Sequence, residues 1–410
     1  MIYSAKRILP LFFLFCSSQL IFGQNTSISG IWRAEIPTVA GPLPFQLEVS
    51  TQSKPWKAWA INGEERLELD TPVFVGDSLH IPMEIFDATI VVKVEGDRMT
   101  GKLNRKTGSL ALRSAPLKAV KGNLPRFSPV NSTPPDFAGT YDVKFTDATG
   151  KILYPAVGIF KQKGSDVQAT FLTTTGDYRY LAGQVVGDSL FLSCFDGNHV
   201  FLFKAKVGPK QLTGGTFCAA FTYTEKWEAT WNPSAALPDP TTLTFLKPGY
   251  SSLDFSFKNT QGKTISLKDP AYRGKVVLVQ IMGSWCPNCM DESRFLAPYY
   301  QKNKKRGLEI IGLAYEKSTD PSFAYPKLDR MKERFGIQYE VLLAGTNDKS
   351  VAAASLPALE KVLSFPTLIV IDKKGMVREI HTGFSGPGTG VYYDKFKSDF
   401  TRLMDQLLAE

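Results

Sequence analysis

Residues 274–289 of this 410-residue chain read GKVVLVQIMGSWCPNC. Val276–Met282 is an almost continuous apolar run, as expected for a strand that is buried on both faces of a sheet. Two cysteines separated by two residues follow it, and the proline between them suits the first turn of a helix, where a missing N–H costs little. This context predicts a redox-active cysteine pair at a strand-to-helix junction.

The two cysteines are expected to have different roles. Cys286 begins the helix, where free backbone N–H groups and the helix dipole favour a thiolate. Because the thiolate is the attacking form, we expect Cys286 to be the nucleophile and Cys289, one turn further on, to resolve the mixed disulfide. A purely structural disulfide is the alternative. Metal binding needs more ligands, and only His381 could add one to a copper site, so we predict no metal and no cofactor.

Strand and helix patterns alternate around this motif from about residue 241 onward. The expected strands are 253–257, 265–267, 276–282, 308–314, 365–371 and 376–381, and the expected helices are 286–304, 326–335 and 393–408. Such alternation, ending in a hairpin and a helix, predicts an α/β fold around one mixed sheet.

Residues from about 250 to 410 resemble the exported TlpA/ResA-like thioredoxin family. The matching positions are Gly274-Lys275, Trp285-Cys286-x-x-Cys289-x-x-Glu292, Phe365-Pro366-Thr367 and Asp372-x-x-Gly375. The resemblance implies a thioredoxin fold and thiol–disulfide exchange. It also implies a cis peptide bond before Pro366, which faces the two sulfur atoms and lets Phe365 present its backbone to a client chain.

Glu292 lies three residues after Cys289, about one helical turn away. In the family that this segment resembles, the acid lies beneath the cysteine pair, where burial would raise its pKa and let it exchange a proton with Cys289. An ordinary surface glutamate is the alternative. The residues that we expect to contact the client are Trp285, Pro287, Phe365 and Pro366.

The first 23 residues have the pattern of a secretory signal peptide. Lys6 and Arg7 precede an apolar run, and a second short apolar stretch leads to Gly23. Cys16 would suit a lipoprotein signal, but Phe15 stands where such signals carry a small residue. No later run is long enough to span a bilayer, so we expect a mature protein of the periplasm or cell envelope, where disulfides are permitted.

The region between the signal peptide and the α/β part is rich in strand-forming residues and contains an internal repeat. Three landmarks recur in the same order at offsets that increase slowly from 109 to 113: Gly30-Ile31-Trp32 with Gly139-Thr140-Tyr141, VGDSL at 75–79 with 186–190, and Thr100-Gly101 with Thr213-Gly214. They predict a duplicated antiparallel β domain, each copy closing into a barrel or a sandwich because closure removes exposed edge strands. The expected divisions are signal peptide 1–23, first β repeat 24–126, second β repeat 138–232, linker 233–248 and thioredoxin-like domain 249–410.

Two features of the β repeats allow other interpretations. The Gly-Asp-Ser-Leu strings resemble a hydrolase motif, but a turn before a new strand explains both copies. Cys194 and Cys218 fall in expected strands of the second repeat. The sequence leaves open whether they are buried thiols or a cross-strand disulfide, because pairing requires Cα atoms within about 7 Å.

The predicted function is an extracytoplasmic disulfide reductase, with a disulfide-containing client protein and a membrane-bound thiol donor as partners. The formal net charge of +9 is spread along the chain, so we expect no nucleic-acid partner. The direction of electron flow comes from the family resemblance, and an oxidant or isomerase is the alternative. A second alternative is that the β repeats form a binding or docking module served by an accessory thioredoxin domain. A thiol peroxidase would need a Thr-x-x-Cys arrangement, which the motif lacks.

Overall fold

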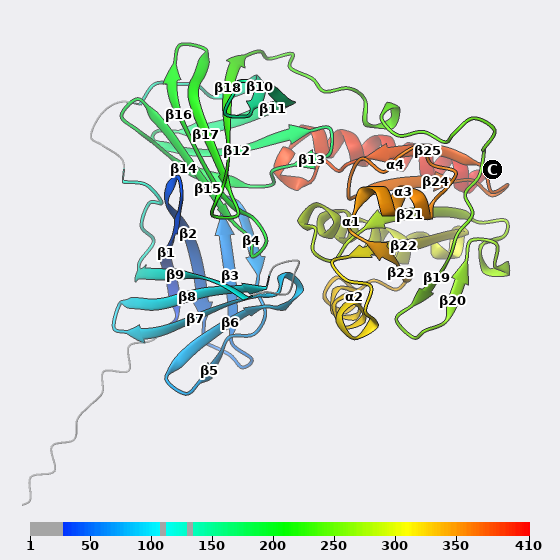
Figure 1. Cartoon of the computed structure of the whole chain (residues 1–410), viewed down its shortest axis with the longest axis horizontal. Helices are drawn as coiled ribbons and strands as arrows, with labels where there is room; N and C mark the ends of the chain where they lie inside the picture. The colour runs from blue at the N-terminus through cyan, green and yellow to red at the C-terminus, as the bar shows by residue number, and fades with distance from the viewer. Residues whose placement is uncertain (1–27, 107–111, 129–133) are drawn as a thin grey trace, which may run out of the picture.

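The computed structural model describes residues 28–106, 112–128 and 134–410, so the expected signal peptide and Cys16 lie outside the described residues. Two β repeats lie side by side, and an α/β domain lies next to both of them (Figure 1). This arrangement confirms the predicted fold class, a duplicated antiparallel β domain followed by a thioredoxin-type domain.

The first β repeat, described for 28–106 and 112–128, is a nine-stranded antiparallel sheet. Its strands are β1 (Gly30–Thr38), β2 (Gly41–Ser50), β3 (Lys57–Asn62), β4 (Glu65–Glu68), β5 (Val73–Val75), β6 (Ser78–Met83), β7 (Ala88–Glu95), β8 (Arg98–Lys106) and β9 (Leu112–Lys121). The order is β4-β3-β2-β1-β9-β8-β7-β6-β5, which leaves β4 and β5 at the edges. The sheet is therefore an open half-barrel.

The second β repeat is fully described between residues 139 and 231 and has the same number of strands. They are β10 (Gly139–Thr146), β11 (Ile152–Lys163), β12 (Asp166–Thr173), β13 (Gly176–Asp177), β14 (Leu181–Val186), β15 (Ser189–Phe195), β16 (Val200–Gly208), β17 (Gln211–Ala219) and β18 (Tyr223–Trp231). Here β11 pairs with β12 as well as with β10, and β12 pairs with β14. The pairing of β12 with β14 closes the second repeat into a barrel, because the corresponding strands of the first repeat, β3 and β5, do not pair.

The landmarks of the internal repeat occupy equivalent places in the two sheets. Trp32 and Tyr141 lie in the first strand of each repeat, are buried, and donate to the carbonyl four residues earlier, Ile28 at 2.9 Å and Phe137 at 2.8 Å. The VGDSL strings form the turn from β5 to β6 and the turn from β14 to β15. Each turn needs its glycine, since the φ angles of 62° and 63° lie in the left-handed region.

The open side of the first repeat packs against the second repeat. Phe45 on β2 and Phe195 on β15 have ring centroids 4.2 Å apart, and both belong to one core that also contains Trp32. Arg126 is buried in the segment that leaves the first repeat, and its guanidinium donates to Asn62 at 3.1 Å and to the carbonyl of Ser193 at 2.8 Å. The two repeats thus share apolar and polar contacts and form one unit.

Cys194 and Cys218 are buried, free thiols. Cys194 pairs with Phe201 across the sheet, and Cys218 pairs with Leu202. Since neighbouring residues of β16 point to opposite faces, the two thiols lie on opposite sides of the sheet. Cys194 lies in the core of the closed barrel and Cys218 in the core shared with the first repeat, so the alternative of a cross-strand disulfide is wrong for this structure.

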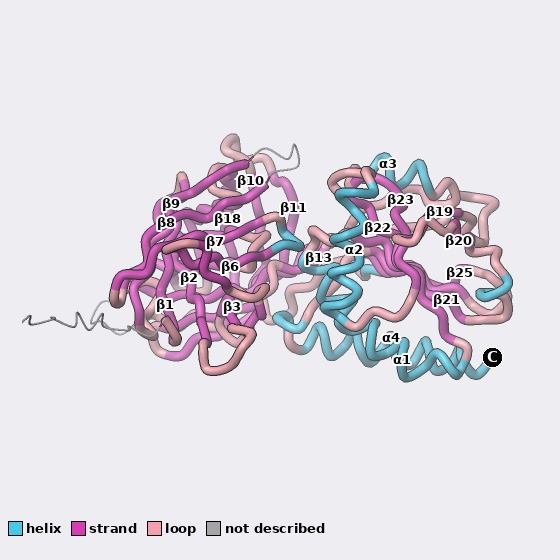
Figure 2. Tube along the Cα trace, turned by 90° about the horizontal axis from the view of Figure 1, so that it is seen from below, coloured by secondary structure: helices cyan, strands magenta, loops and turns pink. Residues whose placement is uncertain are grey.

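The α/β domain, fully described from 249 to 410, has a mixed sheet ordered β20-β19-β23-β22-β21-β24-β25. Its strands are β19 (Ser256–Asn259), β20 (Thr264–Ser266), β21 (Val276–Met282), β22 (Leu308–Glu316), β23 (Glu340–Thr346), β24 (Thr367–Ile371) and β25 (Val377–Thr382). Its helices are α1 (Pro287–Asn303), α2 (Pro321–Phe335), α3 (Lys349–Ser355) and α4 (Val391–Ala409). The domain also has the short 3-10 helices η3 (Pro270–Tyr272), η4 (Lys304–Arg306) and η5 (Pro387–Thr389). Two others lie outside it: η1 (Glu84–Phe86) in the first repeat and η2 (Pro240–Thr242) in the linker. Helices α1 and α4 pack together through Phe295 and Phe400 on one face of the sheet (Figure 2).

Several expected boundaries in this domain are wrong, and the sequence did not predict β23 or α3. Strand β19 is Ser256–Asn259 and not 253–257. Helix α2 begins at Pro321 and not at Pro326, because Asp320 caps it by accepting from the N–H of Ser322 and Pro321 occupies the first turn. Strand β24 begins at Thr367 and not at residue 365, in keeping with the absence of an N–H on Pro366. Among the described residues, none of the helices has the length and apolar character needed to cross a membrane.

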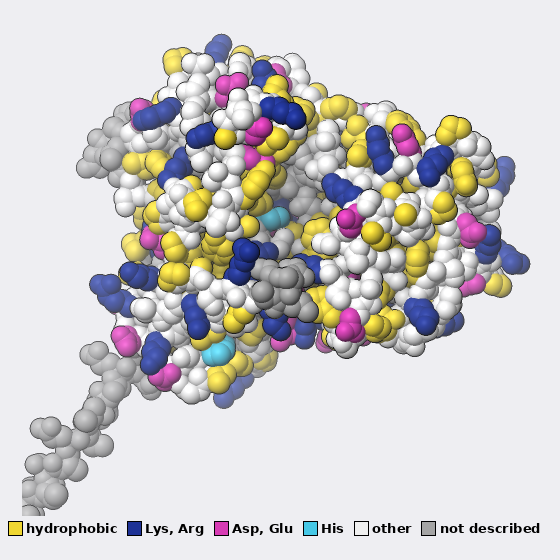
Figure 3. Space-filling model, in the orientation of Figure 1, with side chains coloured by type: hydrophobic (Ala, Val, Ile, Leu, Met, Phe, Trp, Pro, Cys, Tyr) yellow, Lys and Arg dark blue, Asp and Glu magenta, His cyan; other side chains and the backbone are white. Residues whose placement is uncertain are grey.

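The β repeats and the α/β domain meet along a charged seam, which Figure 3 shows as a hollow on one face of the molecule. Basic side chains of α2 face acidic side chains of the first repeat. The ion pairs are Lys327 with Asp87, Arg330 with Glu84, and Arg334 with Asp70. A groove of about 1260 Å³ runs between β4 on one side and α1 and α2 on the other.

Candidate active site: the cysteine pair

The two cysteines of the motif lie at the start of α1 and differ in exposure. Cys286 is the N-cap residue, and its sulfur accepts from the backbone N–H of Cys289 at 3.3 Å. The residue Cys286 is 6% exposed, whereas Cys289 is fully buried. Both are free thiols in this structure. Only the first sulfur can therefore be approached from outside, which is the asymmetry that an attacking and a resolving cysteine require.

Glu292 is fully buried beneath the cysteine pair. One carboxylate oxygen accepts from the side-chain amide of Gln280 at 2.8 Å, and the other has no hydrogen-bond partner within the described residues. Burial raises the pKa of Glu292 to about 8, although the hydrogen bond from Gln280 opposes the shift. Burial also raises the pKa of the Cys289 thiol, and the side-chain hydrogen bond with Cys286 adds to that effect. The surface-glutamate alternative is wrong for this structure.

Gln280 is the residue of this site that sequence reasoning missed. It is the polar residue within the otherwise apolar strand β21, and it is 1% exposed. Besides Glu292, it contacts the carbonyl of Cys289 at 3.4 Å and accepts from the hydroxyl of Ser293 at 3.2 Å. A glutamine in a strand buried on both faces needs partners in the core, and that exception to the pattern was the available signal.

The loop that follows α3 places its proline against the cysteine pair. The peptide bond between Phe365 and Pro366 is cis, as the family resemblance implied. The thiol of Cys286 donates to the carbonyl of Phe365 at 3.3 Å. Trp285 packs edge-on against the Phe365 ring at 5.6 Å, and its indole N–H donates to the carbonyl of Tyr315 at 2.8 Å. The structure thus brings Trp285, Phe365 and Pro366 together around Cys286.

A buried carboxylate holds the segment before the motif. Glu316, at the end of β22, accepts from the backbone N–H and the hydroxyl of Ser284, both at 2.7 Å. Burial raises the pKa of Glu316, and the two hydrogen bonds from Ser284 oppose the shift. This pair fixes the turn between β21 and α1, because a buried carboxylate is costly unless its oxygens accept hydrogen bonds.

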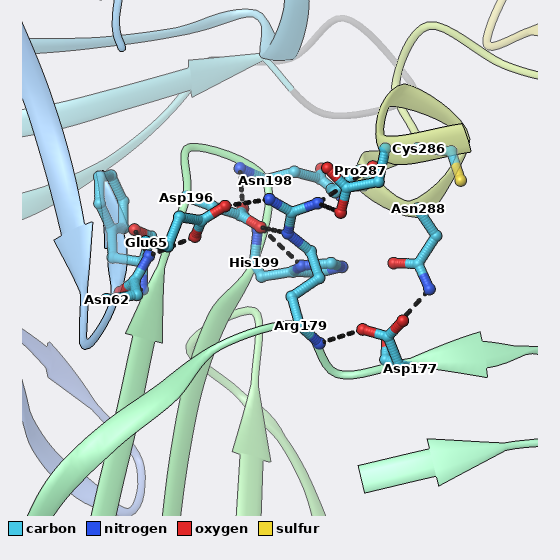
Figure 4. Close-up of polar contacts among 12 residues, drawn as sticks. Asn62, Glu65, Asp177, Arg179, Asp196, Asn198, His199, Cys286, Pro287 and Asn288 are labelled. Carbon is cyan, nitrogen blue, oxygen red and sulfur yellow. Dashed lines mark hydrogen bonds and ion pairs between the residues drawn. The ribbon is translucent and has the colours of Figure 1, made fainter. Parts of the chain in front are cut away.

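The second β repeat reaches the cysteine motif directly, which the sequence did not indicate. The side-chain amide of Asn288, between the two cysteines, donates to the carbonyl of Asp177 at 3.0 Å (Figure 4). The carboxylate of Asp177 accepts from the backbone N–H of Gly386 at 2.6 Å, and burial raises its pKa to about 6. Ser364, two residues before the cis-proline, donates its hydroxyl to the carbonyl of Thr175.

Arg179 is the centre of a buried ion cluster at this contact (Figure 4). Its side chain is 2% exposed and donates to the carbonyl of Pro287 at 3.2 Å. The guanidinium also pairs with carboxylates from three parts of the chain, which are Glu65, Asp196 and Asp291. Asp196 in turn contacts His199 at 2.8 Å. The cluster thereby joins both β repeats to the first turns of α1.

Within residues 28–106, 112–128 and 134–410, no group of three or more His, Cys, Asp or Glu side chains is arranged to hold a metal. His381, the one ligand considered for copper, directs its ring nitrogen to the carbonyl of Gly383 at 3.1 Å and packs against Phe396.

Comparison with known proteins places these features in context. The AhpC/TSA family model matches residues 248–380. Thiol-disulfide oxidoreductase ResA of Geobacillus kaustophilus is 30% identical over 145 residues, which are 35% of this chain and 74% of the relative. Thioredoxin-like protein YneN of Bacillus subtilis is 25% identical over 138 residues, covering 34% of this chain and 73% of the relative. A crystal structure of a thioredoxin-family thiol:disulfide interchange protein from Chlorobium tepidum is 22% identical, covers 43% of this chain and 99% of its own, and has a TM-score of 0.30.

Proposed function

The chain belongs to the TlpA/ResA-like family of thiol-disulfide oxidoreductases, and on this premise we propose that it reduces disulfides of client proteins outside the cytoplasm. The observation that carries the proposal is the asymmetry of the cysteine pair, with Cys286 at the helix N-terminus and slightly exposed and Cys289 fully buried one turn further on. Only an outer cysteine can attack a protein disulfide, and only an inner one can stay shielded until it resolves the intermediate.

The reaction proceeds in two exchanges. The Cys286 thiolate attacks one sulfur of the client disulfide, forming a mixed disulfide and releasing the other client sulfur as a thiolate that takes up a proton. Cys289, after losing its proton, attacks Cys286 and releases the second client thiol. Two electrons have then passed to the client, and Cys286 and Cys289 are joined by a disulfide.

Glu292 is the proposed acceptor of the Cys289 proton. Its pKa of about 8 leaves a minority of molecules with an ionised Glu292 at neutral pH, and that carboxylate is the form that takes the proton from Cys289. The carboxylate oxygen without a partner is available for that exchange. Trp285, Pro287, Phe365 and Pro366 form the proposed client contact, since they surround Cys286.

Reduced protein must be regenerated after each cycle, and a membrane-bound thiol donor outside the cytoplasm is the proposed source of the two electrons. The N-terminal pattern of Lys6, Arg7 and the following apolar run supports a periplasmic or cell-envelope location. The expected client is a disulfide-containing protein.

The reduction potential of the Cys286–Cys289 couple tests the direction of transfer. It is measured in the full chain with Cys194 and Cys218 replaced by alanine, so that one couple reports, and a Cys289→Ser variant serves as the control that cannot form it. A value near or below about −250 mV supports a reductase. A value of about −120 to −150 mV would identify an oxidant or isomerase and reverse the proposed direction.

A further inference from the structure

The turn between β12 and β13 of the second repeat packs against the part of the α/β domain that surrounds the cysteine pair. Thr175 accepts from Ser364 next to the cis-proline, and Asp177 accepts from Gly386 and, through its carbonyl, from Asn288. These contacts come from three separate parts of the α/β domain: the first turn of α1, the loop before β24 and the loop before α4. A segment of the β repeats, Thr175–Arg179, therefore forms one wall of the redox site, and we call it the wall segment.

The wall segment packs closely against the α/β domain, as the space around two glycines of that domain shows. A Cβ atom built at Gly383 would lie 2.9 Å from the backbone of Thr175, and one at Gly388 would lie 2.8 Å from the carbonyl oxygen of Arg179. Real Cβ atoms essentially never approach other atoms below 3.0 Å. Backbone meets backbone here, so the gap cannot be widened by the rotation of a flexible side chain alone.

Charges hold the wall segment and the rest of the β repeats in this position. The guanidinium of Arg179 contacts Asp291 and the carbonyl of Pro287 on α1. At a separate place along the seam, Asp87 of the first repeat pairs with Lys327 and lies 3.8 Å from Lys317. Side chains of these pairs are at most 15% exposed, so water screens them weakly.

The result is a redox site with little free surface around the attacking sulfur. Cys286 is 6% exposed, Phe365 8%, and Ser364 2%. The exposed disulfide of a folded protein is surrounded by a rigid surface that would collide with the wall segment before its sulfur reached Cys286. A disulfide in a flexible, extended segment carries no such surface.

We propose that the wall segment Thr175–Arg179 selects clients, admitting disulfides in extended or unfolded segments and excluding disulfides held on the surface of a folded domain. The proposal deepens the proposed function and rests on it, because it names the substrate class of the same site. Exchange through Cys286 follows the same steps and the same electron balance for both kinds of disulfide, and only access differs.

The test compares the reaction rates of the reduced full chain with three disulfides. They are dithiobis(nitrobenzoate), a short unstructured peptide closed by one disulfide, and native pancreatic trypsin inhibitor as the folded protein. Each rate is divided by the rate of dithiothreitol with the same disulfide, which removes differences in intrinsic reactivity. Two variants open the seam without touching the cysteine site: Gly388→Ala, which pushes on the carbonyl of Arg179, and Asp87→Asn, which removes the charge that faces α2.

Each variant has a matched control. Gly312→Ala adds the same methyl group where the nearest atom is 3.4 Å away, and Asp188→Asn removes an exposed β-repeat acid whose partner Lys206 does not face the α/β domain. We expect the wild type to react with the small disulfide and the peptide but poorly with the folded protein. If the open form makes up a few per cent or less of the wild-type molecules, a variant that is mostly open should react with the folded protein about tenfold faster or more. The small-disulfide rate should stay within about twofold. The urea-unfolding midpoint of each variant, measured beside that of its control, shows whether the variant is folded.

Equal normalised rates for the peptide and the folded protein in the wild type would overturn the selection. The selection would also be overturned if neither Gly388→Ala nor Asp87→Asn reacted faster with the folded protein than its matched control does. Failure of the wild type to react through Cys286 with any of the three disulfides, the small one included, is a different result. It would refute the proposed function, and the client selection with it.

Discussion

Glu292→Gln should change the pH dependence of folding stability in a way that the structure specifies. Burial raises the pKa of Glu292 from an ordinary value of 4.5 to about 8. The folded chain therefore holds this proton more tightly than the unfolded chain does. A raised acid pKa makes stability fall as pH rises, starting near the unfolded pKa and levelling off above the folded one.

The size of the effect follows from the two pKa values. Ionising the carboxyl in the unfolded but not in the folded chain costs about 3 kcal/mol of stability at pH 7 and about 5 kcal/mol above pH 8. Glutamine keeps the hydrogen bond from Gln280 and cannot ionise, so the variant lacks this loss. The stability of the variant relative to the wild type should therefore rise by about 1.4 kcal/mol per pH unit between pH 5 and 8.

The assay is urea unfolding of the reduced chain at several pH values, followed by the change in tryptophan fluorescence. The difference between variant and wild type cancels the titration of other groups. Glu360→Gln, which changes an exposed glutamate of the same domain, is the control. A flat difference for Glu292→Gln would show that this carboxyl titrates alike in both states, and the proton-transfer role proposed for it would lose its basis.

Three further outcomes are expected. Gln280→Leu removes the hydrogen bond that lowers the pKa of Glu292, so the fall of stability with pH should level off at a higher pH. Because the buried Glu292 then lacks this partner, the variant should also lose about 1–3 kcal/mol of stability. Phe195→Ala removes the ring that packs against Phe45 between the repeats and should cost about 3–5 kcal/mol in urea unfolding, while an unchanged midpoint would mean that the repeats do not depend on each other. Cys194, whose thiol is buried with a pKa raised chiefly by burial, should resist alkylation in the native chain and react after denaturation, and mass spectrometry would contradict this if it found native labelling.

Local sequence patterns predicted the elements of the redox domain well. The apolar run Val276–Met282 coincides with β21, and the cysteine motif opens α1 as expected. A run buried on both faces and a proline in a first helical turn are local signals, since each depends on neighbouring residues. The sequence did not predict β23 or α3, and two of the boundaries that failed lie at Pro321 and Thr367, where a cap and a proline without an N–H decide the start of an element.

The repeat was also visible in the sequence, but its closure was not. Both copies have equivalent strands, and β2 pairs with β3 as β11 pairs with β12, yet only the second copy also pairs β12 with β14, which closes it into a barrel. In the first copy, the open side is covered by Phe195 and its neighbours from the second copy. Whether an edge is paired or covered depends on which surfaces meet in space, and strand patterns carry no information about that.

The sequence by itself determined the chemistry of this protein: a cysteine pair at a helix start, a glutamate one turn below it, and a proline loop that faces it. The tertiary structure decided what surrounds that chemistry. Arg179 and Asp291 are 112 residues apart in the chain, and their pairing brings a wall of the second β repeat onto the redox motif. A thiolate at a helix N-terminus follows from short-range backbone geometry, whereas access to it depends on contacts between distant segments, which only the packing of the folded chain creates.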